Sequence, residues 1–263
     1  ADRKREVYKK RSLGRTFGVC FDNSNSKQSY RGRNHTKNKH QGCVMSHLLK
    51  EINAVETWLK ERSKGIGGSD AACILGLNPY KTNVELWKEK TGRAKAQDIS
   101  QKPCVVYGKK AEEYLRELFK LDYPEYKVTH NPYDLHIHKG FNFIQASLDG
   151  ELLEIKTALR GIFECKTTEI HRPQDWEKWN KQIPMNYFCQ VLHYFAIDED
   201  YKFCKLKVQI KHKNEKETQL TTKHYHILRE EHEDDINYLI EKECEFWHYV
   251  EKDKEPPLKL PSI

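Results

Sequence analysis

Apolar residues recur every three or four positions in several segments between residues 46 and 120, and this spacing predicts helices. The expected helices span 46–62, 70–75, 83–91 and 106–120. The first begins behind Ser46 as N-cap, and the second follows Ser69, a candidate N-cap at the end of the sequence KGIGGSD. The apolar stripe of the first helix consists of Leu48, Leu49, Ile52, Val55 and Leu59. Ala111, Leu115 and Leu118 form the expected inner stripe of the fourth.

From about residue 127 the period changes to two, which predicts strands. The expected strands span 127–136, 143–155, 161–167, 202–211 and 217–228. A helix at 184–197 separates the third strand from the fourth, and a last amphipathic helix at 231–250 turns Ile236, Leu239, Ile240, Trp247 and Val250 inward. The order of helices, strands, helix, strands and helix favours an α/β fold with a mixed central β-sheet flanked by helices.

The composition favours a folded protein. Of the 263 residues, 37% are hydrophobic, 32% are charged and 11% are aromatic, and the aromatic share is too high for a disordered chain. No apolar run is long enough for a membrane span, and the N-terminus lacks the apolar stretch of a signal peptide. We therefore expect no membrane association and a cytoplasmic location.

Eight cysteines are scattered without a C-x-x-C motif, so reduced core thiols are expected rather than disulfides. One alternative stays open near the N-terminus. Cys20, His35, His40 and Cys43 could together hold zinc, although their spacing fits no zinc-finger pattern.

Positive charge is concentrated at the N-terminus. Residues 1–45 carry twelve Lys or Arg against three acids, a net of +9, whereas residues 46–263 are close to neutral at −2. A basic segment rich in Asn, Ser and Gly suits contacts with phosphates, and a solvated tail is the alternative. We expect a basic polar extension over 1–45 and a single domain over 46–263.

An acid-x-Lys pattern occurs twice within thirteen residues, as Glu154-Ile155-Lys156 and Glu164-Cys165-Lys166. On a strand such a pair shares one face, which suits a carboxylate on a metal beside an ammonium near the attacking water. If 144–155 is one continuous strand, Asp149 and Glu154 point to opposite faces. A hairpin then brings Glu164 across from Asp149, unless a bulge at Gly150 shifts the parity. Glu154 and Lys156 are therefore expected on a solvated hairpin end.

Five ordered blocks carry a resemblance to a known family. They are GIGGSDAACILGLNPY, YGKKAEEYLRELF, ASLDG, ECKTT and YFCQVLHYF. The set resembles the YqaJ and lambda exonuclease family of viral recombination nucleases, in the PD-(D/E)xK superfamily, over about residues 58–197. The resemblance implies a restriction-endonuclease-like (PD-(D/E)xK) core, and makes residues 46–263 a single nuclease domain.

The resemblance implies that Asp149 and Glu164 bind divalent metals, assisted by the backbone carbonyl of Cys165. Lys166 would orient the attacking water or help to deprotonate it. The helix acid of the family falls on Glu112. Independently, Glu112 borders the buried stripe because it lies one turn from Leu115, whereas its neighbour Glu113 shares a face with charged residues including Arg116. A surface ion pair is the alternative for Glu112.

Gln190 matches the family's glutamine behind the site, and a satisfied core polar group is its alternative. Arg62 and Ser69 match the residues that grip a terminal 5′ phosphate, a role that suits a guanidinium fork and a helix N-terminus. A plain N-cap is the alternative for Ser69. Further candidates for DNA contacts are Lys109, Lys102 and Tyr187. Structural roles are expected for Asp70 at the helix start, for His193, and for Trp176, Trp179 and Trp247, of which the first two could also lie near DNA.

The function that the resemblance implies is a DNA exonuclease dependent on Mg²⁺ or Mn²⁺, with two ions at its site. It would digest one strand of duplex DNA from a 5′ end and expose a 3′ single strand for a single-strand annealing protein, as a ring-shaped trimer of viral or prophage origin. It would act in the host cytoplasm, or in the nucleus of a eukaryotic host. The alternatives are a structure-specific or restriction-type endonuclease on the same core and a non-catalytic DNA-binding protein. An iron–sulfur nuclease is discounted because only Cys244 lies where three cysteines are required.

Overall fold

The computed structural model describes residues 52–213 and 217–260. The chain divides into two units, Ala1–Leu48 and Leu49–Ile263, and only the second contains described residues. The basic extension, the candidate zinc ligands and the first turn of the helix expected at 46–62 lie outside the described residues.

The expected helices are confirmed within a few residues of their ends. Residues 52–62 are helical. The later helices are α2 (Gly68–Leu75), α3 (Asn83–Lys90), α4 (Pro103–Asp122), α5 (Met185–Ile197) and α6 (Glu233–Glu251). The strands are β1 (Tyr126–Thr129), β2 (His136–Ile137), β3 (Gln145–Ala146), β4 (Gly150–Glu154), β5 (Arg160–Ile170), β6 (Tyr201–Lys213) and β7 (Thr218–Leu228), with short 3-10 helices at Pro173–Trp179 and Arg229–Glu231.

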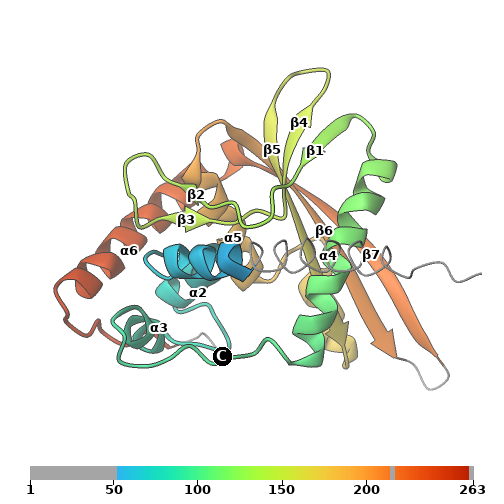
Figure 1. Ribbon diagram of the computed structural model, residues 1–263. Helices are drawn as coiled ribbons and strands as arrows, with labels where there is room; N and C mark the ends of the chain where they lie inside the picture. The colour runs from blue at the N-terminus through green and yellow to red at the C-terminus, as the bar shows by residue number, and fades with distance from the viewer. Residues whose placement is uncertain (1–51, 214–216, 261–263) are drawn as a thin grey trace, which may run out of the picture. The chain divides into compact units, whose positions relative to one another are not determined.

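Five strands form one mixed sheet in the order β1-β4-β5-β6-β7. Strand β5 pairs with β4 antiparallel and with β6 parallel, and β6 and β7 form a long antiparallel hairpin (Figure 1). The parallel pair is joined through α5, as a crossover connection requires. The expected mixed sheet flanked by helices is therefore confirmed.

Two of the predicted strands are each divided into two shorter strands in the structure. Residues 127–136 divide into β1 and β2, and residues 143–155 divide into β3 and β4, while β2 and β3 form a separate two-stranded sheet. The second break coincides with side-chain contacts that replace ladder pairing. Ser147 Oγ donates to the carbonyl of Asp134 at 3.0 Å, and Asp149 Oδ2 accepts from the amide of Cys165 at 2.9 Å.

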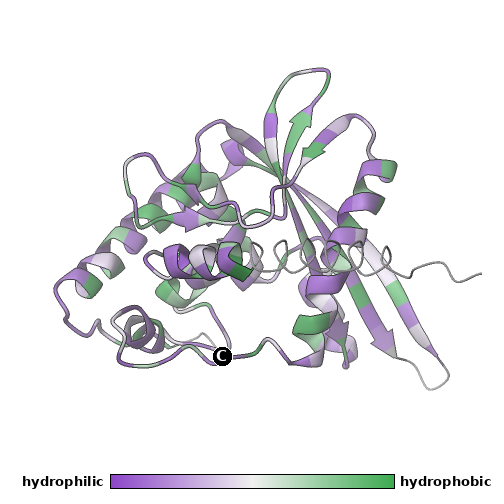
Figure 2. Ribbon diagram, in the orientation of Figure 1, coloured by the Kyte–Doolittle hydropathy of each residue, from purple (hydrophilic) through white to green (hydrophobic). Residues whose placement is uncertain are grey.

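Alternation along β5 separates the two sides of the sheet. Phe163 and Cys165 pack with Leu115 and Phe119 of α4 on one side. Ile162 faces the opposite side, where α5 packs on the sheet and α2 and α6 pack against α5 (Figure 1). Apolar and hydrophilic residues alternate along α4 and α6, as expected for helices that bury one side (Figure 2). Glu164 and Lys166 share the parity of Ile162 and so belong to the α5 side.

Several burial predictions need correction. Leu118 is exposed, whereas Phe119 and Arg116 are buried, because the face of α4 that meets the sheet runs through Ala111, Leu115 and Phe119. Ile52 and Leu59 are likewise exposed. The six cysteines in the described part of the chain are free thiols, as expected. No helix within residues 52–213 and 217–260 combines the length and apolarity needed to cross a membrane.

Candidate active site

The acidic centre of the site lies in the middle of β5. Glu164 is 1% exposed, and Lys166 Nζ lies 2.5 Å from its Oε1. Both carboxylate oxygens are buried and neither has a regular hydrogen-bond partner, so the contact with Lys166 is an ion pair only. Burial and the nearby Asp149 raise the pKa of Glu164 to about 8, against the opposing effect of Lys166. Burial alone would lower the pKa of Lys166, but Glu164, Tyr194 and Asp149 raise it.

Asp149 reaches this centre from the residue before β4. Its Oδ2 accepts a hydrogen bond from the backbone amide of Cys165, the residue between Glu164 and Lys166. Asp149 and Glu164 are therefore brought together, as the sequence argument expects. The expected strand is broken at residues 147–149, but the β4–β5 register that pairs Gly150 with Phe163 still sets Asp149 opposite Glu164.

Glu112 joins the site from α4 through Arg116. Arg116 Nη1 lies 3.2 Å from Glu112 Oε1 and donates to the backbone carbonyl of Asp149 at 2.8 Å. Burial and Asp149 raise the pKa of Glu112, while Arg116 opposes the increase. The sequence analysis placed Arg116 on the charged outer face, but it is 8% exposed. The i, i+4 spacing of Glu112 and Arg116 was the available signal for this contact.

Helix α5 forms the wall that faces Lys166. Gln190 Nε2 donates to the hydroxyl of Tyr194, and Lys166 Nζ lies 5.4 Å from the ring centre of Tyr187. Tyr187 in turn stacks on the buried Trp179. Gly68 allows α2 to approach this wall closely, since a Cβ there would lie 2.6 Å from Tyr194 Cε1.

The N-terminus of α2 lies beside Arg62. A Cβ on Gly67 would lie 3.5 Å from Arg62 Nη2, and Gly67, not Ser69, is the N-cap. Ser69 is exposed in the first turn, so the plain N-cap alternative is wrong. Asp70 serves the helix start, as expected, by accepting from the amide of Gly67 at 3.1 Å.

Lys90 of α3 fixes this loop, a role that the sequence analysis missed. Its Nζ lies 2.8 Å from Asp70 Oδ2 and donates to the carbonyl of Gly65 at 2.6 Å. Burial raises the pKa of Asp70, but Lys90 and the Gly67 amide lower it overall. Nothing in the sequence brings α3 to this loop, because the contact depends on tertiary packing.

Other candidates lie apart from this centre. Lys109 and Lys102 are exposed at α4 without contacts to the acidic residues. Glu154 accepts hydrogen bonds from Thr157 and Tyr126 at the end of the β4–β5 hairpin, where Lys156 is exposed. Packing roles are found for Trp179, which is 3% exposed, and for Trp247, which stacks on Phe143. Trp176 lies edge-on to the ring of His212.

His193 has the structural role that was expected. Its Nδ1 lies 2.7 Å from Glu243 Oε1 and its Nε2 lies 2.8 Å from the carbonyl of Gln145. All of the His193 and Glu243 side chains are buried. The pair ties α5 and α6 to β3, which is not one of the strands that carry the acidic centre.

The carboxylate oxygens of this centre are the type of ligand that a hard divalent cation prefers. Asp149, Glu164 and Glu112 offer carboxylates, and both buried oxygens of Glu164 lack a regular hydrogen bond, with only the ion pair to Lys166 beside them. Within the part of the chain that the structure describes, no group of three or more His, Cys, Asp or Glu is arranged to hold a metal ion as it stands. In this arrangement Lys166 and Arg116 supply the positive charge beside the carboxylates.

Comparisons with known proteins agree with this architecture. An alkaline exonuclease from Laribacter hongkongensis superimposes with a TM-score of 0.56 at 15% identity, covering 75% of this chain and 93% of the other. A structure of that enzyme in complex with dAMP gives a TM-score of 0.53 at 16% identity, with the same coverage. These likenesses show that the chain shares the fold of that exonuclease.

Sequence comparison identifies the family. The uncharacterised protein YqaJ of Bacillus subtilis (strain 168) is 39% identical over 142 residues, which are 54% of this chain. This chain spans only 42% of the length of that relative. Residues 57–200 match the YqaJ-like viral recombinase domain. The match covers more than half of the chain and includes all of the acidic centre. The chain therefore belongs to the family of YqaJ-like viral recombinase domains.

Proposed function

We propose that the protein is a metal-dependent DNA exonuclease that digests one strand of a duplex from its 5′ end. The single observation that carries the proposal is the buried Glu164 carboxylate, which contacts Lys166 as an ion pair and whose pKa burial and Asp149 raise to about 8 against the effect of Lys166. An acid in this state costs the fold stability, which is typical of a functional site. The exonuclease fold and the recombinase family support the same conclusion.

Nucleases of this kind generally use divalent metal ions. Asp149, Glu164 and the carbonyl of Cys165 would hold the ion, with Glu112 beside them, and we propose two Mg²⁺ ions with Mn²⁺ as a substitute. A bound ion would neutralise phosphate charge and activate water. Lys166, whose Nζ lies 2.5 Å from Glu164 Oε1, would orient the attacking water or help to deprotonate it.

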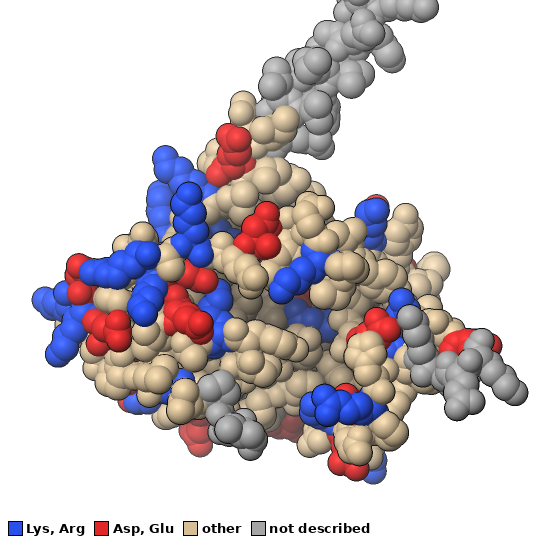
Figure 3. All heavy atoms as spheres, turned by 90° about the horizontal axis from the view of Figure 1, so that it is seen from below, with Lys and Arg blue, Asp and Glu red and all other residues tan. Residues whose placement is uncertain are grey.

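Substrate contacts would come from the elements around this centre. Gln190, held by Tyr194, and Tyr187 line the α5 side of Lys166. Arg62 and Ser69 at the start of α2 suit a terminal 5′ phosphate, and Lys109 at α4 suits the backbone of the duplex. Lys and Arg side chains lie in and around a hollow on the face seen from below, interspersed with Asp and Glu (Figure 3).

The experiment uses linear duplexes labelled at either the 5′ or the 3′ end, and covalently closed circles, each with magnesium. The proposal expects early release of the 5′ label, a 3′ label that stays on a strand shortened progressively from its 5′ end, and intact circles. Cleavage of closed circles would establish an endonuclease instead. Binding without any digestion would leave a non-catalytic DNA-binding protein.

The resemblance to the family adds two assembly partners to the proposal. A single-strand annealing protein would receive the exposed 3′ strand, and three copies of the chain would form a ring around DNA. Sedimentation of the full chain tests the trimer, and a monomer at all concentrations would reject it.

A further inference from the structure

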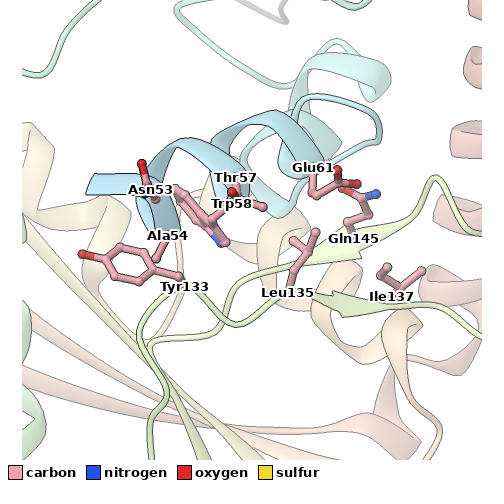
Figure 4. A pocket seen from close by; sticks show the side chains of 9 residues that line it. All are labelled: Asn53, Ala54, Thr57, Trp58, Glu61, Tyr133, Leu135, Ile137 and Gln145. Atoms are coloured by element: carbon pink, nitrogen blue, oxygen red, sulfur yellow. The ribbon is translucent and has the colours of Figure 1, made fainter. Parts of the chain in front are cut away.

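A cavity of about 570 Å³ lies beside the proposed phosphate site, between the helix over residues 52–62 and the segment that leads into β2 (Figure 4). Its walls are mostly apolar, with Trp58 and Tyr133 as the two aromatic rings. Polar side chains at its edge are Asn53, Thr57, Glu61 and Gln145. Neither the acidic centre nor the helix packing described above uses this cavity.

The two aromatic rings are set at an angle to each other, and both side chains are partly accessible to solvent. Their centres are 6.1 Å apart at 62°, an edge-to-face arrangement. Tyr133 is 47% exposed and has a left-handed backbone (φ 65°), which is uncommon for a bulky residue. Such backbone conformations gather at functional sites. The left-handed turn holds the Tyr133 ring at the mouth of the cavity instead of against the core.

Trp58 connects this cavity both to the acidic centre and to the proposed phosphate site. Its Nε1 donates to Ser147 Oγ at 3.2 Å, two residues before Asp149. The guanidinium of Arg62 lies over the Trp58 ring, 5.2 Å from its centre, and is also next to Gly67 at the start of α2. A nucleotide whose phosphate binds Arg62 therefore has its base within reach of Trp58 and Tyr133.

The charges around the cavity suit this ligand. Arg62 supplies the cation for a phosphate, and the acid at the rim, Glu61, is paired with Lys64 at 2.7 Å. Every DNA base has a flat surface for stacking, so an aromatic wall accepts bases without sequence preference. An aliphatic groove for a protein segment would need neither the adjacent cation nor a tyrosine held out in a left-handed turn.

We propose that this cavity, which we call the Trp58–Tyr133 pocket, binds an unpaired nucleobase of the 5′-terminated strand by stacking. The proposal rests on the proposed function, since it takes Arg62 as the phosphate contact. It adds a base-binding subsite that would hold the end of the strand open beside the acidic centre.

The test compares two 5′-phosphorylated single-stranded oligonucleotides that carry a 3′ fluorophore. In the second, abasic tetrahydrofuran residues replace the two 5′-terminal nucleotides, which removes the bases and keeps the phosphates. Affinity for the full chain is measured by fluorescence anisotropy in EDTA, so that no digestion occurs. We expect the wild type to bind the intact oligonucleotide about 5- to 100-fold more tightly.

Tyr133→Asn removes the ring while keeping a residue that tolerates the left-handed backbone. This variant should weaken binding of the intact oligonucleotide and should no longer distinguish it from the abasic one. Tyr238→Ala, at a half-exposed tyrosine of α6, is the matched control and should retain the full discrimination.

Equal affinity of the wild type for both oligonucleotides would overturn the proposal and would favour a protein segment as the occupant. Equal weakening of both oligonucleotides by Tyr133→Asn would overturn it as well. Digestion of linear duplex DNA with magnesium is measured on the same preparations. If digestion occurs without base discrimination, only the pocket proposal fails, and if discrimination occurs without digestion, only the proposed function fails.

Discussion

Replacing Glu164 with Gln should stabilise the protein in the absence of metal while abolishing nuclease activity. Glutamine matches the shape of a protonated glutamate, so the variant removes the charge and preserves packing. The folded-state pKa of about 8 lies above the ordinary value of 4.5. The folded protein therefore loses stability as the pH rises from 4.5 to 8, because Glu164 must ionise where it is buried beside Asp149.

The magnitude follows from the size of that shift. A shift of about 3.5 pKa units corresponds to at most about 5 kcal/mol above pH 8, at about 1.4 kcal/mol per unit. Local relaxation and water entry reduce this cost, so we expect a gain of about 1–3 kcal/mol for Glu164→Gln, or roughly 2–10 °C in Tm. Below pH 4.5 the gain should vanish, because Glu164 is then protonated in both the folded and the unfolded protein.

The assay is thermal or urea unfolding in EDTA at pH 4.5 and pH 8.5, together with digestion of linear duplex DNA. Glu154→Gln, at the part-buried acid near the end of the β4–β5 hairpin, is the matched control: it should not stabilise the protein at pH 8.5 and should leave digestion unchanged. A Glu164→Gln variant that is less stable than the wild type at pH 8.5 would refute the reasoning, since Glu164 would then stabilise the fold as an ion-pair partner of Lys166.

Three further predictions concern the metal, α2 and the N-terminal extension. Magnesium affinity should fall about tenfold per pH unit below pH 8, because the ion must displace one proton from Glu164, and calorimetry showing a flat profile would contradict this. Gly68→Ala should destabilise the fold by about 1–3 kcal/mol and lower the digestion rate. The reason is that the added methyl group would lie 2.6 Å from Tyr194 Cε1, so that α2 or α5 must shift. Unchanged stability and an unchanged digestion rate would count against this contact. Deleting residues 1–45 should weaken DNA binding and reduce its salt dependence, and an unchanged salt slope in anisotropy titrations would reject the phosphate-binding role of the extension.

Local patterns in the sequence were sufficient for most of the helices and strands. Alternation along β6 and helical spacing along α5 and α6 reflect one-sided burial, which any stable sheet or helix of this kind must satisfy. The pairing of Asp149 with Glu164 was also predicted. The antiparallel register that pairs Gly150 with Phe163 sets Asp149 opposite Glu164, and the Cys165 amide then holds the Asp149 carboxylate.

Contacts between distant segments could not be predicted in the same way. Arg116 is a charged residue on a helix, and its burial depends on the carbonyl of Asp149 lying 2.8 Å away. Lys90 and Asp70 are both common surface residue types, and only the packing of α3 against the 65–70 loop pairs them. The Trp58–Tyr133 pocket likewise depends on a left-handed residue whose backbone angle has no signal in a Pro-Tyr-Asp sequence.

The most direct test of the account mutates the glutamate of each acid-x-Lys motif separately and compares the two variants. Glu164→Ala and Glu154→Ala are prepared in parallel, their folding is checked by circular dichroism, and digestion of a 5′-labelled linear duplex is measured with magnesium. The account predicts that Glu164→Ala is inactive and that Glu154→Ala digests DNA at close to the wild-type rate. Activity retained by Glu164→Ala and lost by Glu154→Ala would contradict it.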